Sequence, residues 1–205
     1  MAAQQKMVFP LFSAPVYVNN VGDFARPDIK SLEYSTGEFR FLTSADKRVL
    51  HRPEFSAVHA IVMREVESYT REVLAVNRSI EFYVTDSWIN IYRRGEAAGP
   101  HTHNNSLISG VLYLKVNDSS GDLVFQRDIH SLVPFPPALD LDMDFFNLYN
   151  CKSWAHKPKV NDICLFPSVV MHAADPNLSD EERWCLAFNV FVRGNIGALH
   201  KLNIR

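Results

Sequence analysis

One amphipathic helix stands out in the pattern of apolar positions. Between about Pro53 and Val76, apolar residues recur every three or four positions, with charged residues between them. The apolar positions are Phe55, Val58, Val62, Val66, Tyr69, Val73 and Val76. Pro53 suits the first helical turn, where its missing N–H is not needed. The pattern predicts a surface helix with one buried face.

After Val76 the pattern changes to short extended segments separated by Gly, Pro, Asn and Asp. Strands are predicted at 80–92, 106–116, 122–126, 160–166 and 183–193. An irregular edge strand, interrupted by two prolines, is expected within 7–18 and covers another element. We therefore expect a mainly β fold, a sandwich or jelly roll with the N-terminal helix packed outside.

The chain carries no internal repeat, Gly/Ser-rich linker or block of like charge that marks a domain boundary. We expect a single domain over 1–205, in which about 1–78 supports a β core at about 79–195. An irregular stretch at 127–158, containing PFPP and DLDMDFF, interrupts this core. Connections of this length are often lids or binding loops.

Composition and charge exclude several classes of protein. The 205 residues carry 21 basic and 23 acidic side chains, a net charge of −2, so no basic field attracts nucleic acid. No long apolar run predicts a membrane span, and the first residues do not resemble a signal peptide. The three cysteines form no CxxC pair, which suits reduced thiols. We expect a soluble cytoplasmic protein without nucleic-acid or membrane partners; a homodimer through the helix or an edge strand is compatible with the sequence.

Two histidines two positions apart carry the first chemical signal. His101 and His103 follow Gly99-Pro100, which disfavours a helix, and in an extended segment both imidazoles point to the same side. Two neutral imidazoles are half of a metal site, and His172, after a short apolar strand, is the natural third ligand. The alternative is that His101 and His103 are polar residues of an exposed loop.

Arg183 begins a predicted strand whose two faces differ. Large apolar residues occupy one face, whereas Arg183 and Asn189 lie on the other. A guanidinium that points into a barrel needs a carboxylate, from the protein or from a ligand. A dianionic cosubstrate would supply that carboxylate. The alternative is a surface ion pair with Asp180, Glu181 or Glu182.

Two tyrosines lie where they could reach the same cavity. Tyr92 shares a strand face with Trp88 and Asn90, and Tyr113 keeps the parity of the His101 position if no bulge intervenes. Each could instead be a core tyrosine with a locally bonded hydroxyl.

Read in chain order, these residues resemble a known family. The series comprises Tyr92, the pair His101 and His103, Tyr113-Leu114, the segment GDLVF, His172 and Arg183. It resembles the 2-oxoglutarate- and Fe(II)-dependent dioxygenases of the double-stranded β-helix fold, with the prolyl-hydroxylase-like branch nearest. More narrowly, WINIYRRG, HTHNNSLISGVLYL and LFPSVVMHAADPNLSDEERWCLAFN are similar to a group of bacterial and phage oxygenases of about this length. The resemblance covers roughly Asp86 to Val192.

The resemblance implies a cupin-like jelly roll and a role for each of these residues. His101, His103 and His172 would hold Fe(II), and Arg183 would bind the distal carboxylate of 2-oxoglutarate. Tyr92 and Tyr113 would hydrogen-bond along the cosubstrate, while Asn90 and Asn189 would face cosubstrate or substrate. O2 would be the second cosubstrate, and an acceptor, either a small molecule or a peptidyl side chain, would be hydroxylated.

One departure from the family pattern concerns the metal. The usual motif is His-x-Asp/Glu…His, but position 103 is a histidine here. With His103 as ligand the metal keeps its full +2 charge. Asp118, Asp122 and Asp175 are fallback carboxylates without the expected spacing.

Two other functions remain open from the sequence. A three-histidine cupin-type metalloenzyme, such as a thiol dioxygenase or isomerase, would use no 2-oxoglutarate. A non-catalytic jelly-roll binding module would carry the histidines incidentally. Three histidines without a carboxylate favour the three-histidine enzyme, whereas the spacing of His172 and Arg183, with Tyr113 before Leu114, speaks against it. Failure to bind any divalent metal would favour the binding module.

Overall fold

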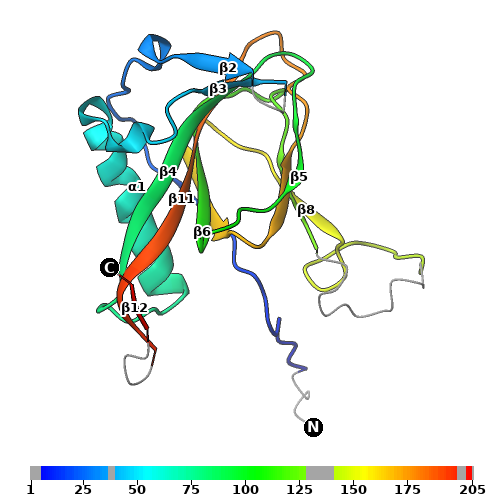
Figure 1. Cartoon of the computed structure of the whole chain (residues 1–205). Coiled ribbons are helices and arrows are strands. Elements are labelled where there is room, and N and C mark those ends of the chain that lie inside the picture. Colours follow the sequence, from blue (N-terminus) through cyan, green and yellow to red (C-terminus); the bar gives the residue numbers. More distant parts are fainter. Residues whose placement is uncertain (1–5, 37–39, 128–140, 198–201, 205) are drawn as a thin grey trace.

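Two antiparallel β sheets form the framework of the computed structural model, which describes residues 6–36, 40–127, 141–197 and 202–204 (Figure 1). The strands of the larger sheet are β1 (Tyr17–Asn20), β2 (Tyr34–Thr36), β3 (Leu42–Ser44), β4 (Glu81–Tyr92), β6 (Ile108–Lys115), β9 (Asp162–Pro167), β11 (Arg183–Ile196) and β12 (Leu202–Ile204). Their order is β1-β9-β6-β11-β4-β3-β2, with β12 paired to β11. The smaller sheet has the order β5-β10-β7-β8, from β5 (Ala98–His101), β10 (Met171–Ala174), β7 (Leu123–Gln126) and β8 (Ser153–His156).

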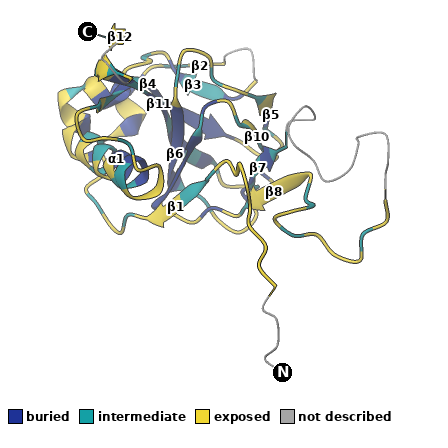
Figure 2. Ribbon diagram, turned by 90° about the horizontal axis from the view of Figure 1, so that it is seen from below, coloured by how far each residue is buried: buried dark blue, intermediate teal, exposed yellow. Residues whose placement is uncertain are grey.

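The predicted helix packs on the outer face of the larger sheet (Figures 1 and 2). A 3-10 turn at Pro53–Phe55 leads into α1 (Ser56–Ser68), which ends in a π-helical turn, Tyr69–Val73. The apolar stripe from Phe55 to Tyr69 is buried as predicted. Val73 is 47 % exposed, contrary to the prediction, because the wider π turn takes it off the buried face. Further 3-10 turns of three residues lie at Ile29–Ser31 and Val49–His51.

The larger sheet separates two apolar cores. One core lies between α1 and this sheet and includes Leu186 and Phe188 of β11. The other lies between the two sheets and includes Tyr113 and Cys185. The predicted alternation along β11 is therefore confirmed, since its large apolar side chains face the helix while Arg183 and Cys185 line the space between the sheets.

The expected mainly β fold is confirmed, with corrections at some elements. The N-terminal edge strand is β1, which begins at Tyr17, later than expected, because the two prolines lie before it. The stretch at 127–158 is not all loop, since β8 pairs with β7. Residues 128–140 of that stretch lie outside the described residues. Within the described ranges, no helix is long and apolar enough to cross a membrane.

Candidate metal and cosubstrate site

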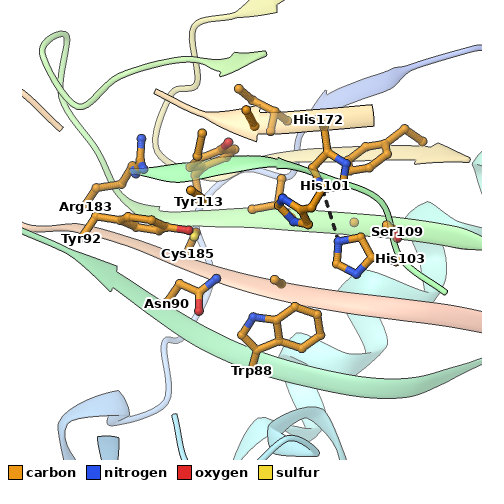
Figure 3. Close-up of a pocket in the computed structure, with 18 residues that line it drawn as sticks. Trp88, Asn90, Tyr92, His101, His103, Ser109, Tyr113, His172, Arg183 and Cys185 are labelled. Atoms are coloured by element: carbon orange, nitrogen blue, oxygen red, sulfur yellow. Dashed lines mark hydrogen bonds between the residues drawn. The ribbon is translucent and has the colours of Figure 1, made fainter. Parts of the chain in front are cut away.

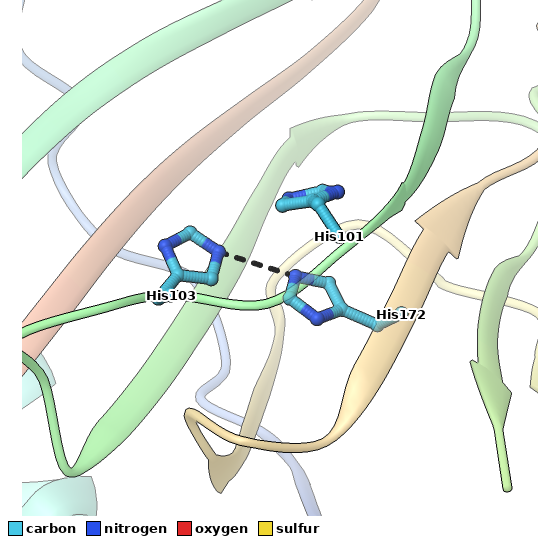
Figure 4. A group of neighbouring side chains, drawn as sticks. All are labelled: His101, His103 and His172. Carbon is cyan, nitrogen blue, oxygen red and sulfur yellow. Dashed lines mark hydrogen bonds between the residues drawn. The ribbon is translucent and has the colours of Figure 1, made fainter. Parts of the chain in front are cut away.

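The three predicted histidines come together at one end of the smaller sheet (Figure 4). His101 ends β5 and pairs in register with His172 of β10. His103 lies just beyond β5, where its backbone N–H donates to the carbonyl of Ser168 at 3.0 Å. Strand pairing therefore places two imidazoles side by side, and the hydrogen bond to Ser168 fixes the segment that carries the third.

The ligand atoms of this histidine group converge. One ring nitrogen from each histidine lies within 4.8 Å of the others, and the Nε2 atoms of His103 and His172 are 3.2 Å apart. Nδ1 of His101 lies 2.8 Å from the carbonyl oxygen of Gly99, and Nδ1 of His172 lies 3.0 Å from that of Val170. Because a carbonyl oxygen can only accept, Nδ1 carries the proton in both rings. Nε2 is then the unprotonated ring nitrogen, which is how metal-ligating histidines are oriented.

Burial keeps the imidazoles of His103 and His172 neutral. Removal from water lowers the pKa of His103 to about 4, with His101 adding to the decrease and Asp86 opposing it. Burial likewise lowers the pKa of His172 to about 4. The neutral imidazole is the form that binds a metal ion.

No carboxylate belongs to the histidine group in the described part of the chain. Asp118 instead pairs with Lys157 at 3.3 Å. Asp122 and Asp175 are joined to each other by a backbone hydrogen bond of 2.9 Å. The donor set that these residues offer is three neutral nitrogens.

Arg183 lies at the far end of the same cavity from the histidines (Figure 3). It is 2 % exposed, and its Nη1 donates to the carbonyls of Ser120 at 2.7 Å and Asp175 at 3.0 Å. Its guanidinium lies 4.1 Å from the ring centroid of Tyr92. Nη2 is buried and has no hydrogen-bond partner. An unpaired guanidinium nitrogen in a cavity is a strong donor site for a carboxylate.

The alternative of a surface ion pair for Arg183 is wrong. Asp180 contacts Arg94, Glu181 pairs with Lys115 at 3.1 Å, and Glu182 lies near Arg93. The three acidic residues therefore have partners of their own at the surface, whereas Arg183 points between the sheets.

Tyr92 and Tyr113 line the cavity between Arg183 and the histidines (Figure 3). Both are 4 % exposed, and burial raises the pKa of each phenol well above its ordinary value. The hydroxyls are therefore protonated and can donate hydrogen bonds to a bound anion.

The two predicted asparagines lie in different surroundings. Asn90 lines the cavity that contains Arg183, and its buried Oδ1 has no partner. Asn189 does not line this cavity but a larger one beside it, where its Nδ2 donates to Asp86 at 3.0 Å and its Oδ1 accepts from Ser109 at 2.9 Å.

Two connected spaces meet at the histidines. The inner cavity, of about 70 Å³, contains Arg183, both tyrosines and all three histidines. A larger outer cavity, of about 450 Å³, shares Trp88, Asn90, Tyr92, His101 and His103 with it. The indole of Trp88 stacks on His103 with 5.9 Å between ring centroids, so it forms part of the wall where the spaces meet.

Several lining residues were missed by sequence reasoning. The outer cavity is also lined by Phe41 just before β3, Thr43 within it and Lys47 after it. Phe41 contacts Tyr92 with 4.3 Å between ring centroids. A three-residue strand shows no alternation long enough to detect. Cys185 could have been found, because it shares the strand face of Arg183.

Comparison with known proteins agrees with this geometry. The family model described as "Putative 2OG-Fe(II) oxygenase" matches residues 86–189, just over half of the chain. The chain belongs to this 2-oxoglutarate- and Fe(II)-dependent oxygenase family. The match begins two residues before Trp88 and ends at Asn189, so it spans the histidines and Arg183. Family membership makes the protein an oxygenase with Fe(II), 2-oxoglutarate and O2 as its metal and cosubstrates.

Solved oxygenase structures share the fold at low sequence identity. The structure of HygX from Streptomyces hygroscopicus with nickel and 2-oxoglutarate bound is 12 % identical and covers 86 % of this chain and 82 % of its own, with a TM-score of 0.60. A 2OG-Fe(II) oxygenase family protein from Burkholderia pseudomallei is 12 % identical, with 78 % and 72 % covered and a TM-score of 0.54.

The carbocyclase SnoK from nogalamycin biosynthesis is 14 % identical, with 81 % of this chain and 70 % of its own covered and a TM-score of 0.55. These likenesses confirm the jelly roll expected for the oxygenase. No curated protein matches the chain.

Proposed function

We propose that this oxygenase is a hydroxylase. It transfers one oxygen atom of O2 to a C–H bond of its substrate, and the other enters the succinate that forms with CO2 from 2-oxoglutarate. The observation that carries the proposal is the shared cavity, in which the unpaired Nη2 of Arg183 and the three converging histidines stand at opposite ends.

The donor chemistry of the site suits Fe(II). His101, His103 and His172 would hold it through Nε2, with the Nδ1 hydrogens of His101 and His172 given to backbone carbonyls. Imidazole is a good ligand for iron, and three protein ligands leave positions open for other molecules. Fe(II), when bound, supplies the electrons and the open positions that O2 activation requires.

The chain's own residues would bind and orient the cosubstrate. Arg183 receives the distal carboxylate at Nη2, while its Nη1 stays anchored to the carbonyls of Ser120 and Asp175. The phenols of Tyr92 and Tyr113, kept protonated by burial, donate to the oxygens of the bound acid. Because the guanidinium and both phenols are buried, water competes little for these contacts.

Three histidines without a carboxylate would also suit a three-histidine enzyme, but the cavity of Arg183 would then have no assigned ligand. A three-histidine enzyme without 2-oxoglutarate leaves the buried Nη2 of Arg183 with no partner, which is costly for a charged group. A non-catalytic binding module is wrong for a member of an oxygenase family.

The proposal is tested by following succinate by NMR when equal amounts of Fe(II)-loaded protein and 2-oxoglutarate are exposed to air. Wild type is expected to form succinate, and His172→Ala is expected to form none above the metal-free background. His51→Ala is the matched control, since His51 is exposed and lies in a 3-10 turn outside the histidine group. Absence of succinate with folded wild type would contradict the proposal.

A further inference from the structure

The outer cavity has the position and size of a substrate site. Its volume of about 450 Å³ is within the range in which proteins bind small molecules. Because His101 and His103 are walls of both cavities, a molecule in the outer one lies against the histidine group. None of the described residues at 141–158 lines it.

Two ionic side chains of opposite sign line the outer cavity besides the histidines, Lys47 and Asp86. Nζ of Lys47 donates to Thr43 Oγ1 and to the carbonyl of Ser44, both at 2.9 Å. Neither ionic group takes part in an ion pair with another described residue. The cavity thus offers one positive and one negative charge without an ionic partner.

The carboxylate of Asp86 is held in place by a network that runs into the core. Oδ1 accepts from Thr85 at 2.7 Å, and Oδ2 accepts from Asn189 at 3.0 Å. Oδ1 of Asn189 in turn accepts a hydrogen bond from Oγ of Ser109, and this Oγ lies 2.9 Å from Oγ of Ser168. A carboxylate has about four acceptor positions, so Asp86 keeps acceptors for a ligand in a fixed orientation.

Asn90 adds a third polar contact. It is 8 % exposed and lines both cavities, yet its Oδ1 is buried without a hydrogen-bond partner. A buried acceptor is costly to leave unpaired, so a bound molecule with an N–H or O–H gains by meeting it.

We propose that the outer cavity binds a small zwitterion, a free amino acid or a molecule of similar size. Its ammonium group pairs with Asp86, its carboxylate pairs with Lys47, and Asn90 Oδ1 accepts a further hydrogen. This rests on the proposed function, because it names the substrate class of the same metal site. Of the two substrate classes expected from the sequence, this proposal favours the small molecule over the peptidyl side chain, because a residue within a peptide does not carry both a free α-carboxylate and a free α-amine.

The test measures binding by isothermal titration calorimetry with protein loaded with Ni(II) and 2-oxoglutarate. The probes are the free L-amino acids. For each amino acid that binds, three analogues are then titrated: the decarboxylated amine, the deaminated acid and the N-acetyl amide. We expect at least one amino acid to bind, and loss of either charged group of the ligand to weaken binding roughly ten- to hundredfold.

The variants tie each charge of the ligand to one residue. In Lys47→Gln, removing the carboxylate of the ligand should weaken binding little further, because the partner of that carboxylate is already absent. In Asp86→Asn, removing the ammonium group of the ligand should likewise weaken binding little further. Lys157→Gln and Asp118→Asn are matched controls, an exposed ion pair away from both cavities, and should leave affinity unchanged. Lys47 is exposed, so its variant is expected to fold even if Asp86→Asn disturbs the network.

The outcomes separate this inference from the proposed function. If 2-oxoglutarate binds but no amino acid does, or if the N-acetyl amide binds as tightly as the free amino acid, the zwitterion inference is wrong and the proposed function stands. If 2-oxoglutarate itself does not bind, both are overturned.

Discussion

Arg183 and the histidines form a site whose charges favour a dianion. Neutral imidazoles leave Fe(II) with its full +2 charge, and the guanidinium of Arg183 adds another positive charge at the far end of the inner cavity. A cosubstrate with one carboxylate at each end neutralises both regions at once. The site would therefore select its cosubstrate by charge and length together.

The first prediction at this scale concerns Arg183→Gln. The substitution removes the cation but keeps a polar side chain of similar shape, so the affinity for 2-oxoglutarate should fall by roughly one to two powers of ten. Calorimetry on Ni(II)-loaded protein measures it. Arg193→Gln is the matched control on the same strand, since Arg193 pairs at the surface with Glu81. Equal affinities in the two variants would show that Arg183 does not bind the cosubstrate.

The second prediction concerns His103→Asp. A carboxylate at position 103 restores the usual motif and lowers the charge that the metal presents from +2 to +1. Metal binding should persist, whereas 2-oxoglutarate should bind roughly tenfold more weakly, because its attraction to the metal falls. Titrations of Ni(II) and then 2-oxoglutarate measure both steps. Unchanged affinity for 2-oxoglutarate would mean that the charge of the side chain at position 103 does not influence cosubstrate binding.

At the scale of elements, close packing of β6 on its neighbours positions the cavity wall. A Cβ atom at Gly110 would overlap the ring of Phe188 and lie 2.7 Å from Cδ2 of Leu165. Gly110→Ala should therefore destabilise the fold by about 1–3 kcal/mol. Thermal unfolding should show this as a Tm decrease of roughly 2–4 °C per kcal/mol. Gly99→Ala is the control, because no heavy atom lies within 4 Å of its Cβ position, and a similar decrease there would refute the packing argument.

The helix α1 is tied to β1 by a buried carboxylate, and this gives a pH prediction. Oε2 of Glu65 accepts from Tyr17 at 2.7 Å and from Asn19 at 2.8 Å. Burial alone would raise the pKa of Glu65, but hydrogen bonds from Asn19, Tyr17 and Arg64 outweigh it and hold the pKa below its usual value. The carboxylate therefore contributes stability that is fully present above the unfolded pKa of about 4.5 and is lost as pH falls through the folded value.

Glu65→Gln removes this contribution. Urea midpoints measured between pH 7 and pH 3 should fall less steeply with acid in the variant than in wild type, and the variant should be less stable at pH 7. Parallel pH profiles for the two proteins would rule out the role of Glu65.

The elements that the sequence predicts well are those with long patterns. The helix and the strands β4, β6 and β11 show enough repeats of apolar and polar positions to fix both their type and their inward face. Arg183 was found because it begins one of these strands. The histidines were found from the two-residue spacing of His101 and His103 and from the short apolar segment before His172. By contrast, β2, β3 and β5 have three or four residues, and their existence depends on pairing with distant strands. Lys47 and Asp86 could not be paired from sequence, since their meeting at one cavity is set by the position of β3 beside β4.

At the scale of the whole molecule, the two facing sheets place the candidate metal ligands and the candidate anion-binding residues along one interior space. The smaller sheet supplies His101 and His172, and the larger sheet supplies Arg183, Tyr92 and Tyr113. The outer cavity adjoins this space at His101 and His103 and is also lined by Lys47 and Asp86. Cosubstrate and substrate would thus meet at the metal-binding group, which suits a reaction that couples the oxidation of both.

The most direct test of the account is an anaerobic titration of Fe(II)-loaded protein with 2-oxoglutarate, followed in the visible spectrum. A weak, saturable charge-transfer band should appear in wild type and in Arg193→Gln, should require roughly ten- to hundredfold more 2-oxoglutarate in Arg183→Gln, and should be absent in His172→Ala. Iron that binds stoichiometrically without producing any band would contradict the assignment of this cavity to 2-oxoglutarate.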